Sequence, residues 1–149
     1  MTYGIYFDSS TPAGDLRRAL HTVYNVALEL IYVGPYEDLN AYPGPDPVVL
    51  ITPVDGAFGH ELSGGAALRE LTKATPLELA QAVCRVAGTR ALLDDGSPAP
   101  DYWFLVATDG SYGRVMTDPD TDALTILYAL EPIAGEPGLP VVPPPDWAR

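Results

Sequence analysis

The sequence predicts an α+β fold, in which an antiparallel or mixed sheet is built on a C-terminal three-stranded meander and about two helices pack on one face. The meander is expected in residues 101–130, where three runs rich in aromatic and β-branched residues are separated by turn-forming stretches. The helices are expected in two segments whose apolar residues recur three and four positions apart after a helix-start signal. A chain of 149 residues is expected to form one domain with a sizeable core.

The N-terminal part of the chain predicts a strand, a helix and a second strand. Residues 2–8 have the composition of a strand, and a Thr-Pro pair then places proline at the first position of a helix. Apolar residues at helical spacing continue over residues 16–27. Residues 27–33 favour a strand, which a Gly-Pro pair ends.

The middle of the chain predicts a further strand and the clearest helix. After a proline-rich loop, residues 48–52 have strand composition, and residues 66–73 provide at most two helical turns. The clear helix starts at Thr75, because Thr75 and Glu78 have capping-box spacing and a proline follows Thr75 directly. Gly88 is its expected end.

The first turn of the meander fixes the predicted register. Asp109-Gly110 predicts a two-residue type I′ turn, because this pair tolerates the positive φ angles that such a turn requires. With that turn, Met116 faces Trp103 across the hairpin. The predicted core face contains Tyr102, Phe104, Val106, Val115, Leu124, Ile126, Tyr128 and Leu130. The second, mixed face includes Trp103, Tyr112, Arg114 and Met116, whose residue types are enriched at interface cores.

The domain organisation follows from the distribution of proline. Residues 1–131 are predicted to form a single α+β domain, and residues 132–149 a Pro-rich C-terminal tail. This composition favours an extended polyproline conformation. We expect the tail to be docked on the domain or on a neighbouring molecule.

The charge balance restricts the classes of partner. Twenty acidic residues against eight basic ones give a formal net charge of −12. No nucleic acid and no membrane surface is expected as a partner, because both require a basic footprint. A basic protein partner is expected, since an acidic field speeds the encounter with it. The alternative is that the acidity only maintains solubility.

Cysteine usage and the absence of targeting patterns predict a cytoplasmic protein. The sequence has no run of about 18 apolar residues and no signal-peptide pattern. Its single cysteine, Cys84, excludes an internal disulfide and favours a reducing compartment. Abundant alanine, glycine, proline and arginine are typical of GC-rich coding and suggest a bacterial source. Nothing in the sequence specifies an oligomeric state.

The candidate nucleophiles and bases do not form a catalytic pattern. His60, Glu61 and Ser63 lie too close together in sequence for an ordinary hydrolase triad. No second histidine follows at the spacing of a zinc-binding helix. Cys84 falls on the apolar stripe of the helix that starts at Thr75, where a small buried core residue is expected. We therefore predict no catalytic residues.

A run of alternating aspartates resembles part of a calcium-binding loop. Asp118, Asp120 and Asp122 have the spacing of its first half. Ala123 and Ala129, however, stand where that loop requires glycine and a bidentate glutamate. We therefore expect a solvated turn, with no metal and no cofactor.

These observations together predict a small acidic binding protein without catalysis. The specific hypothesis is an inhibitor or immunity-type protein that neutralises a basic effector protein. The residues expected to contact the partner are Trp103, Tyr112, Arg114, Met116, Glu37, Asp38, Asp118, Asp120 and Asp122. The alternative hypothesis is a small enzyme or ligand-binding domain with a pocket near His60 and Glu61.

Overall fold

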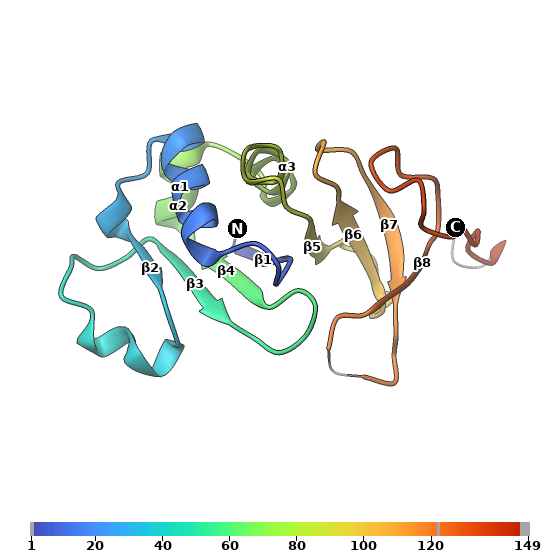
Figure 1. Ribbon diagram of the computed structural model, residues 1–149, viewed down its shortest axis with the longest axis horizontal. Coiled ribbons are helices and arrows are strands. Elements are labelled where there is room, and N and C mark those ends of the chain that lie inside the picture. The colour runs from blue at the N-terminus through green and yellow to red at the C-terminus, as the bar shows by residue number, and fades with distance from the viewer. Residues whose placement is uncertain (1, 122, 147–149) are drawn as a thin grey trace.

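The computed structural model describes residues 2–121 and 123–146 and shows an α+β protein with an eight-stranded mixed sheet (Figure 1). The strands follow the order β2-β3-β4-β1-β5-β6-β7-β8, and among these described strands β2 and β3 form the only parallel pair. The strands are β1 (Tyr3–Phe7), β2 (Ile31–Val33), β3 (Val49–Pro53), β4 (His60–Gly64), β5 (Ala91–Asp94), β6 (Tyr102–Val106), β7 (Tyr112–Thr117) and β8 (Ile126–Ala129). The predicted α+β class is confirmed, and of the two sheet types left open by the sequence, antiparallel or mixed, the sheet is mixed.

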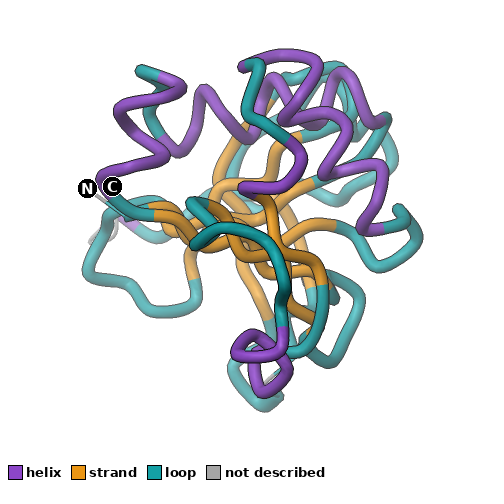
Figure 2. The backbone as a smooth tube through the Cα atoms, turned by 90° about the vertical axis from the view of Figure 1, so that its left-hand side faces the viewer, coloured by secondary structure: helices purple, strands orange, loops and turns teal. Residues whose placement is uncertain are grey.

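The α-helices lie together on one side of the sheet (Figures 1 and 2). The helices are α1 (Ala13–Tyr24), α2 (Ala66–Thr72) and α3 (Pro76–Ala87), with the 3-10 helices η1 (Leu28–Leu30) and η2 (Tyr36–Ala41). The described part of the chain thus has three α-helices where about two were expected, because residues 66–72 form a short complete helix that ends at left-handed Lys73. None of the described helices combines the length and apolar character needed to cross a membrane.

The predicted start and end of α3 are confirmed. The Thr75 side chain accepts a hydrogen bond from the Glu78 backbone N–H (3.2 Å), and Glu78 Oε1 accepts one from the Thr75 N–H (2.9 Å). This reciprocal cap satisfies two backbone donors that the helix itself leaves free. Gly88 ends the helix in the left-handed conformation, with φ at 66°.

The largest core, which we call the helix-side core, fills the space between the α-helices and the sheet. Its strand residues alternate along β1, β3 and β4, so that one face of each strand is buried. Its members are Tyr3, Ile5, Phe7, Leu16, Ala19, Leu20, Val26, Ile31, Val49, Ile51, Leu62, Leu68, Ala74, Leu79, Ala80, Val83, Cys84, Ala91, Leu93 and Val106.

The first turn of the meander differs from the prediction. The Ala107 N–H donates to the Ser111 carbonyl (2.8 Å), which leaves a three-residue loop, Thr108 to Gly110. Gly110 has a φ of 84°, whereas Asp109 has no positive φ, so the turn is not type I′. The Asp109 carboxylate stabilises the longer loop, because Oδ1 accepts from both the N–H (2.9 Å) and the hydroxyl (2.6 Å) of Ser111.

The longer loop shifts the register of the hairpin by one residue. Trp103 pairs with Val115, and Tyr102 pairs with Met116. Residues that face each other in an antiparallel pair project to the same side, so a one-residue shift exchanges the faces of β7. The prediction that Trp103 shares a face with Tyr112, Arg114 and Met116 is therefore wrong: Trp103 lies on the opposite face.

A second core, which we call the tail-side core, lies on that opposite face of the sheet. Its members are Phe58, Leu92, Leu105, Ala107, Val115, Ala129 and Ile133. Trp103 packs against this core and meets the Tyr6 ring edge-on, with the two ring centres 5.9 Å apart. Ile133 covers Gly113, where a Cβ atom would lie only 2.7 Å from Ile133 Cγ1. Glycine at position 113 therefore allows the chain after β8 to lie close to the sheet.

The tail also extends the sheet beyond β8. The Ala129 N–H donates to the Pro140 carbonyl, and the Val142 N–H donates to the Ala129 carbonyl, both at 2.8 Å. A parallel bridge between Ala129 and Val141 results. The tail thus covers part of an edge that would otherwise offer unpaired backbone groups.

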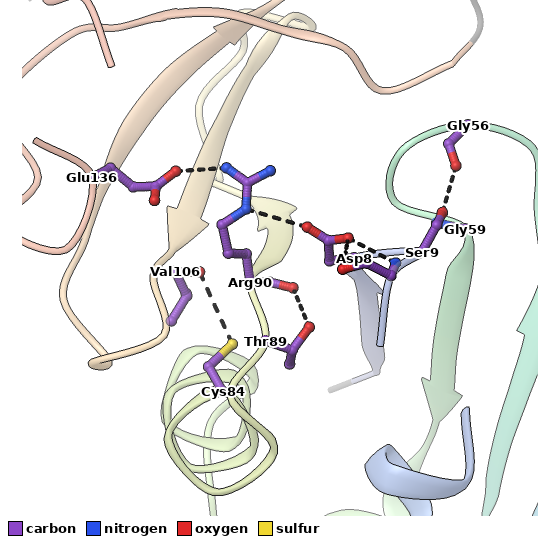
Figure 3. A network of polar contacts seen from close by, with 10 residues as sticks. Asp8, Ser9, Gly56, Gly59, Cys84, Thr89, Arg90, Val106 and Glu136 are labelled. Atoms are coloured by element: carbon purple, nitrogen blue, oxygen red, sulfur yellow. Dashed lines mark hydrogen bonds and ion pairs between the residues drawn. The ribbon is translucent and has the colours of Figure 1, made fainter. Parts of the chain in front are cut away.

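Arg90 connects the tail to the start of the chain (Figure 3). Its guanidinium donates to Asp8 Oδ2 (3.3 Å) and to Glu136 Oε1 (2.6 Å), and it lies 5.3 Å from the centre of the Phe58 ring. Burial alone would raise the pKa of Asp8, but hydrogen bonds from Ser10 and Arg90 outweigh it and hold that pKa below its ordinary value. This network joins three segments that are distant in sequence.

Candidate binding groove

Three side chains from neighbouring strands form a row on the helix side of the meander. Tyr102 of β6 pairs with Met116 of β7, which pairs with Tyr128 of β8, so all three project to the same face. Figure 1 shows the described α-helices grouped over the other strands, with β7 and β8 to one side of them. All three side chains are half-buried. The row therefore lies on a part of the sheet that none of the described α-helices covers.

A groove of about 790 Å³ lies over this row, and its lining is mainly apolar. The loop between β5 and β6 and one residue of the tail enclose it. Besides the row, the lining residues are Ser97, Pro98, Ala99, Pro100, Asp101, Arg114 and Pro145. Concave, mainly apolar sites with a few polar groups are the usual form of a binding site in proteins.

Arg114 brings a positive charge to the side of the groove nearer the Asp109 turn. It pairs with Phe104 across the hairpin and lies on the same face of β7 as Met116, two residues earlier in the chain. Its guanidinium Nε lies 3.9 Å from Glu131 Oε1, while the same oxygen accepts a 2.9 Å hydrogen bond from the Arg114 backbone N–H. The distance of 3.9 Å is too long for a hydrogen bond, so the guanidinium keeps donors for a ligand. On the same face of β7, Tyr112 packs edge-on against Phe104, with the two ring centres 5.4 Å apart.

Aspartates gather at the other end of the groove, where β5, β7 and the loops next to them meet. The Thr117 N–H donates to the Asp101 carbonyl (2.9 Å), which brings the start of β6 beside the end of β7. Asp94 pairs with Trp103, so its side chain projects to the face of the sheet opposite the groove. The aspartates of this acidic end are Asp95, Asp101, Asp118 and Asp120. Their charge favours a cationic group beside the groove.

The β5–β6 loop contains two buried polar atoms that have no hydrogen-bond partner among the described residues. These atoms are Asp95 Oδ2 and Ser97 Oγ. The other carboxylate oxygen, Asp95 Oδ1, accepts the Ser97 N–H at 2.9 Å. Ser97 lines the groove, so these two atoms belong to the groove's wall.

The residues predicted to contact a partner occupy separate parts of the molecule. Tyr112, Arg114 and Met116 share the face of the groove, whereas Trp103 lies behind it. Asp118 and Asp120 lie at the acidic end, and Asp122 falls outside the described residues. Glu37 and Asp38 belong to η2, which follows the edge strand β2 at the opposite side of the sheet.

Sequence reasoning missed the two tyrosines that form the groove's floor. With the two-residue turn, Tyr102 and Tyr128 fell on the predicted core face. The overlooked signal for the position of Met116 between them is the serine after Asp109-Gly110. Its N–H and hydroxyl bind the Asp109 carboxylate and lengthen the turn, which places Met116 opposite Tyr102. Pro98, Pro100 and Pro145 were also missed, since they line the groove from a loop and from the tail.

The alternative site, His60 with Glu61, is divided between two faces of the sheet. His60 pairs with Phe7, which is buried in the helix-side core, and Glu61 pairs with Tyr6 on the other face. Neighbouring residues of an extended strand project in opposite directions, so the two side chains do not converge on one pocket. Burial first, and then the carboxylate of Glu61, raise the pKa of Tyr6.

The other candidate reactive groups lie away from the groove. Cys84 is buried in the helix-side core, and this burial raises the pKa of its thiol to about 12. His21 Nδ1 lies 3.0 Å from the Val26 carbonyl, next to the end of α1. Among residues 2–121 and 123–146, no group of three or more His, Cys, Asp or Glu side chains is arranged to hold a metal ion. Comparison of the chain with protein-family models, with curated proteins and with solved structures gave no match.

Proposed function

We propose that this protein is a small acidic binding protein that uses the groove on its meander to hold a basic protein partner. In its specific form, the proposal is an inhibitor or immunity-type protein that neutralises a basic effector in a bacterial cytoplasm. One observation carries it: an open groove with tyrosines and a methionine on its floor lies directly beside an acidic end.

The two parts of this surface have different physical roles in the proposal. Aromatic side chains, methionine and arginine are the types enriched at the centres of protein interfaces, where they provide most of the affinity. Aspartates at the rim act mainly on the rate of association, because they attract a basic partner over a distance. The net charge of −12 strengthens this attraction at low salt.

The first experiment tests the role of the groove. The tagged wild-type protein and two tagged variants, Tyr128→Ala and Tyr36→Ala, are used to capture partners from cells that encode the protein. The affinity of each captured partner for the three proteins is then measured by calorimetry. Tyr36 is the matched control, because it is 68% exposed and lies in η2 at the far side of the sheet. We expect a basic partner whose activity is lost on binding, and a loss of about 2 kcal/mol in affinity for Tyr128→Ala only.

The second experiment tests the role of the aspartates. Replacing Asp101, Asp118 and Asp120 together by asparagine is expected to slow association and to flatten its salt dependence, with little effect on dissociation. The control replaces Glu37 and Asp38 by their amides at the opposite side of the sheet. An acidic partner, or equal affinities for wild type and Tyr128→Ala, would contradict the proposal.

A further inference from the structure

The floor of the groove has a spacing that suits one particular conformation of a bound chain. Tyr102, Met116 and Tyr128 lie on adjacent strands, and adjacent strands lie about 4.8 Å apart. The two tyrosines are therefore separated by two strand spacings, or about 10 Å. A polyproline II helix rises about 3.1 Å per residue with three residues per turn, so residues i and i+3 lie about 9 Å apart on one side. Such a chain, crossing the strands, places every third residue against a tyrosine.

The groove also offers hydrogen-bond donors that such a chain needs. A polyproline II helix has no internal hydrogen bonds, so its carbonyl groups require donors from outside. The hydroxyl groups of Tyr102 and Tyr128 make no hydrogen bond within the described part of the chain. The Arg114 guanidinium is held only by its 3.9 Å ion pair with Glu131 there. These donors come from the floor and from the side of the groove nearer the Asp109 turn.

The protein's own tail shows that an extended proline-containing segment fits beside this surface. Pro140 and Val142 bond to Ala129 of β8, and Pro145 then reaches the groove. Residues 132–146 of the tail contain no lysine or arginine, and the end of the groove beside Asp101 is acidic. Charge therefore disfavours the tail of a second copy as the occupant and favours a segment with a basic residue.

We infer that the groove binds a Pro-x-x-Pro segment of a partner in the polyproline II conformation, with an arginine or lysine next to the first proline. This inference rests on the proposed function and specifies the chemistry of the partner. The two prolines pack on Tyr102 and Tyr128, with the residues between them over Met116. The basic side chain lies beside Asp101, and the segment's carbonyls accept hydrogen bonds from Arg114 and the tyrosine hydroxyls.

The test uses synthetic peptides and the full-length protein labelled with ¹⁵N. The probe is acetyl-Arg-Ala-Pro-Leu-Ala-Pro-Ala-amide. One matched peptide has both prolines replaced by alanine and keeps the charge, and another has the arginine replaced by glutamine and keeps the prolines. We expect the probe to shift the amide signals of Tyr102, Met116 and Tyr128 in the wild-type protein, and each matched peptide to bind at least about tenfold more weakly. Tyr128→Ala is expected to lower the affinity for the probe by a similar factor, and Tyr36→Ala is expected to leave that affinity unchanged.

The outcomes separate this inference from the proposed function. If the alanine peptide binds as well as the probe, the groove recognises the charge of the peptide and not the polyproline II conformation. In that case only the inference fails. If no peptide shifts the groove signals, the inference also fails, while the proposed function is still decided by the captured partner. A peptide of residues 136–145 that binds more tightly than the probe would identify the tail of a second copy as the occupant and overturn the inference. The signal shifts are measured on wild-type protein, so the result does not depend on a variant that folds.

Discussion

Strands β1, β3 and β4 bury the face that meets the α-helices and leave the other face half-exposed, whereas β7 and β8 bury the opposite face under loops and the tail. The buried side of the sheet therefore changes from one edge to the other. The central strands β5 and β6 contribute to both cores: Leu93 and Val106 belong to the helix-side core, and Leu92 and Leu105 to the tail-side core.

The difference explains why an open groove exists at all. A sheet with helices over its whole length would have no free face at the meander. Here the tail-side core already stabilises β7 and β8 from behind, so their helix-side face is not required for the core and can carry partly exposed tyrosines. The two halves of the sheet thus separate stability from recognition, and the following substitutions test that separation.

The largest effect is expected in the helix-side core. Phe7 is fully buried, and Phe7→Ala should lower the free energy of unfolding by about 3–5 kcal/mol through lost burial and a residual cavity. Urea unfolding followed by circular dichroism measures this loss, with Tyr36→Ala as the exposed aromatic control. A loss below about 1 kcal/mol would show that the helix-side core is not the main source of stability.

Trp103→Ala tests the tail-side core. Trp103 is only half-buried, so a loss of about 2–3 kcal/mol is expected, below the range for a fully buried aromatic residue. Part of the loss comes from the edge-on contact with Tyr6, since aromatic pairs contribute about 0.5–1.5 kcal/mol. Urea unfolding measures the loss, and calorimetry of the folded variant should show unchanged affinity for the partner. Reduced affinity with unchanged stability would place Trp103 in the binding surface after all.

The network around Arg90 predicts a smaller, pH-dependent contribution. The pKa of Asp8 lies below its ordinary value in the folded protein, so its carboxylate stabilises the fold above the unfolded-state pKa of about 3.9. That contribution disappears as the pH falls from there through the folded-state pKa. The difference in unfolding free energy between wild type and Asp8→Asn, measured by urea unfolding from pH 7 to pH 3, should therefore shrink. A difference that stays constant with pH would show that the Asp8 carboxylate does not stabilise the fold through this network.

Local sequence signals were sufficient for the elements whose ends are fixed by nearby residues. The start and end of α3 follow from Thr75, Glu78 and Gly88, which act within one helical turn of the ends they fix. Strand β5 was not anticipated, because Ala91 to Asp94 is a short apolar run without alternation, and its burial on both faces depends on partners elsewhere in the chain.

The candidate site was only partly predictable because it depends on a turn length. Asp109-Gly110 located the hairpin correctly, but the side chain of Asp109 and the contact of Ser111 Oγ with the Gly135 N–H (2.8 Å) favour the three-residue loop. The second of these contacts joins residues far apart in sequence. One residue of difference in the loop exchanged the faces of β7, so that Met116 lies opposite Tyr102 instead of Trp103. The irregular pairing between Met116 and Thr117 places Tyr128 opposite Met116.

The smallest effect on stability is expected at Tyr128, which makes a matched pair with Trp103. Both are half-buried aromatic residues of the meander, but Tyr128 lies on the open helix-side face and belongs to neither core. Tyr128→Ala should therefore change the free energy of unfolding by less than about 1 kcal/mol, as substitutions outside a core usually do. Urea unfolding of the two variants under the same conditions measures the contrast. Equal losses would mean that the groove floor is a third part of the core, and the effect of Tyr128→Ala on binding would then have to be attributed to the fold.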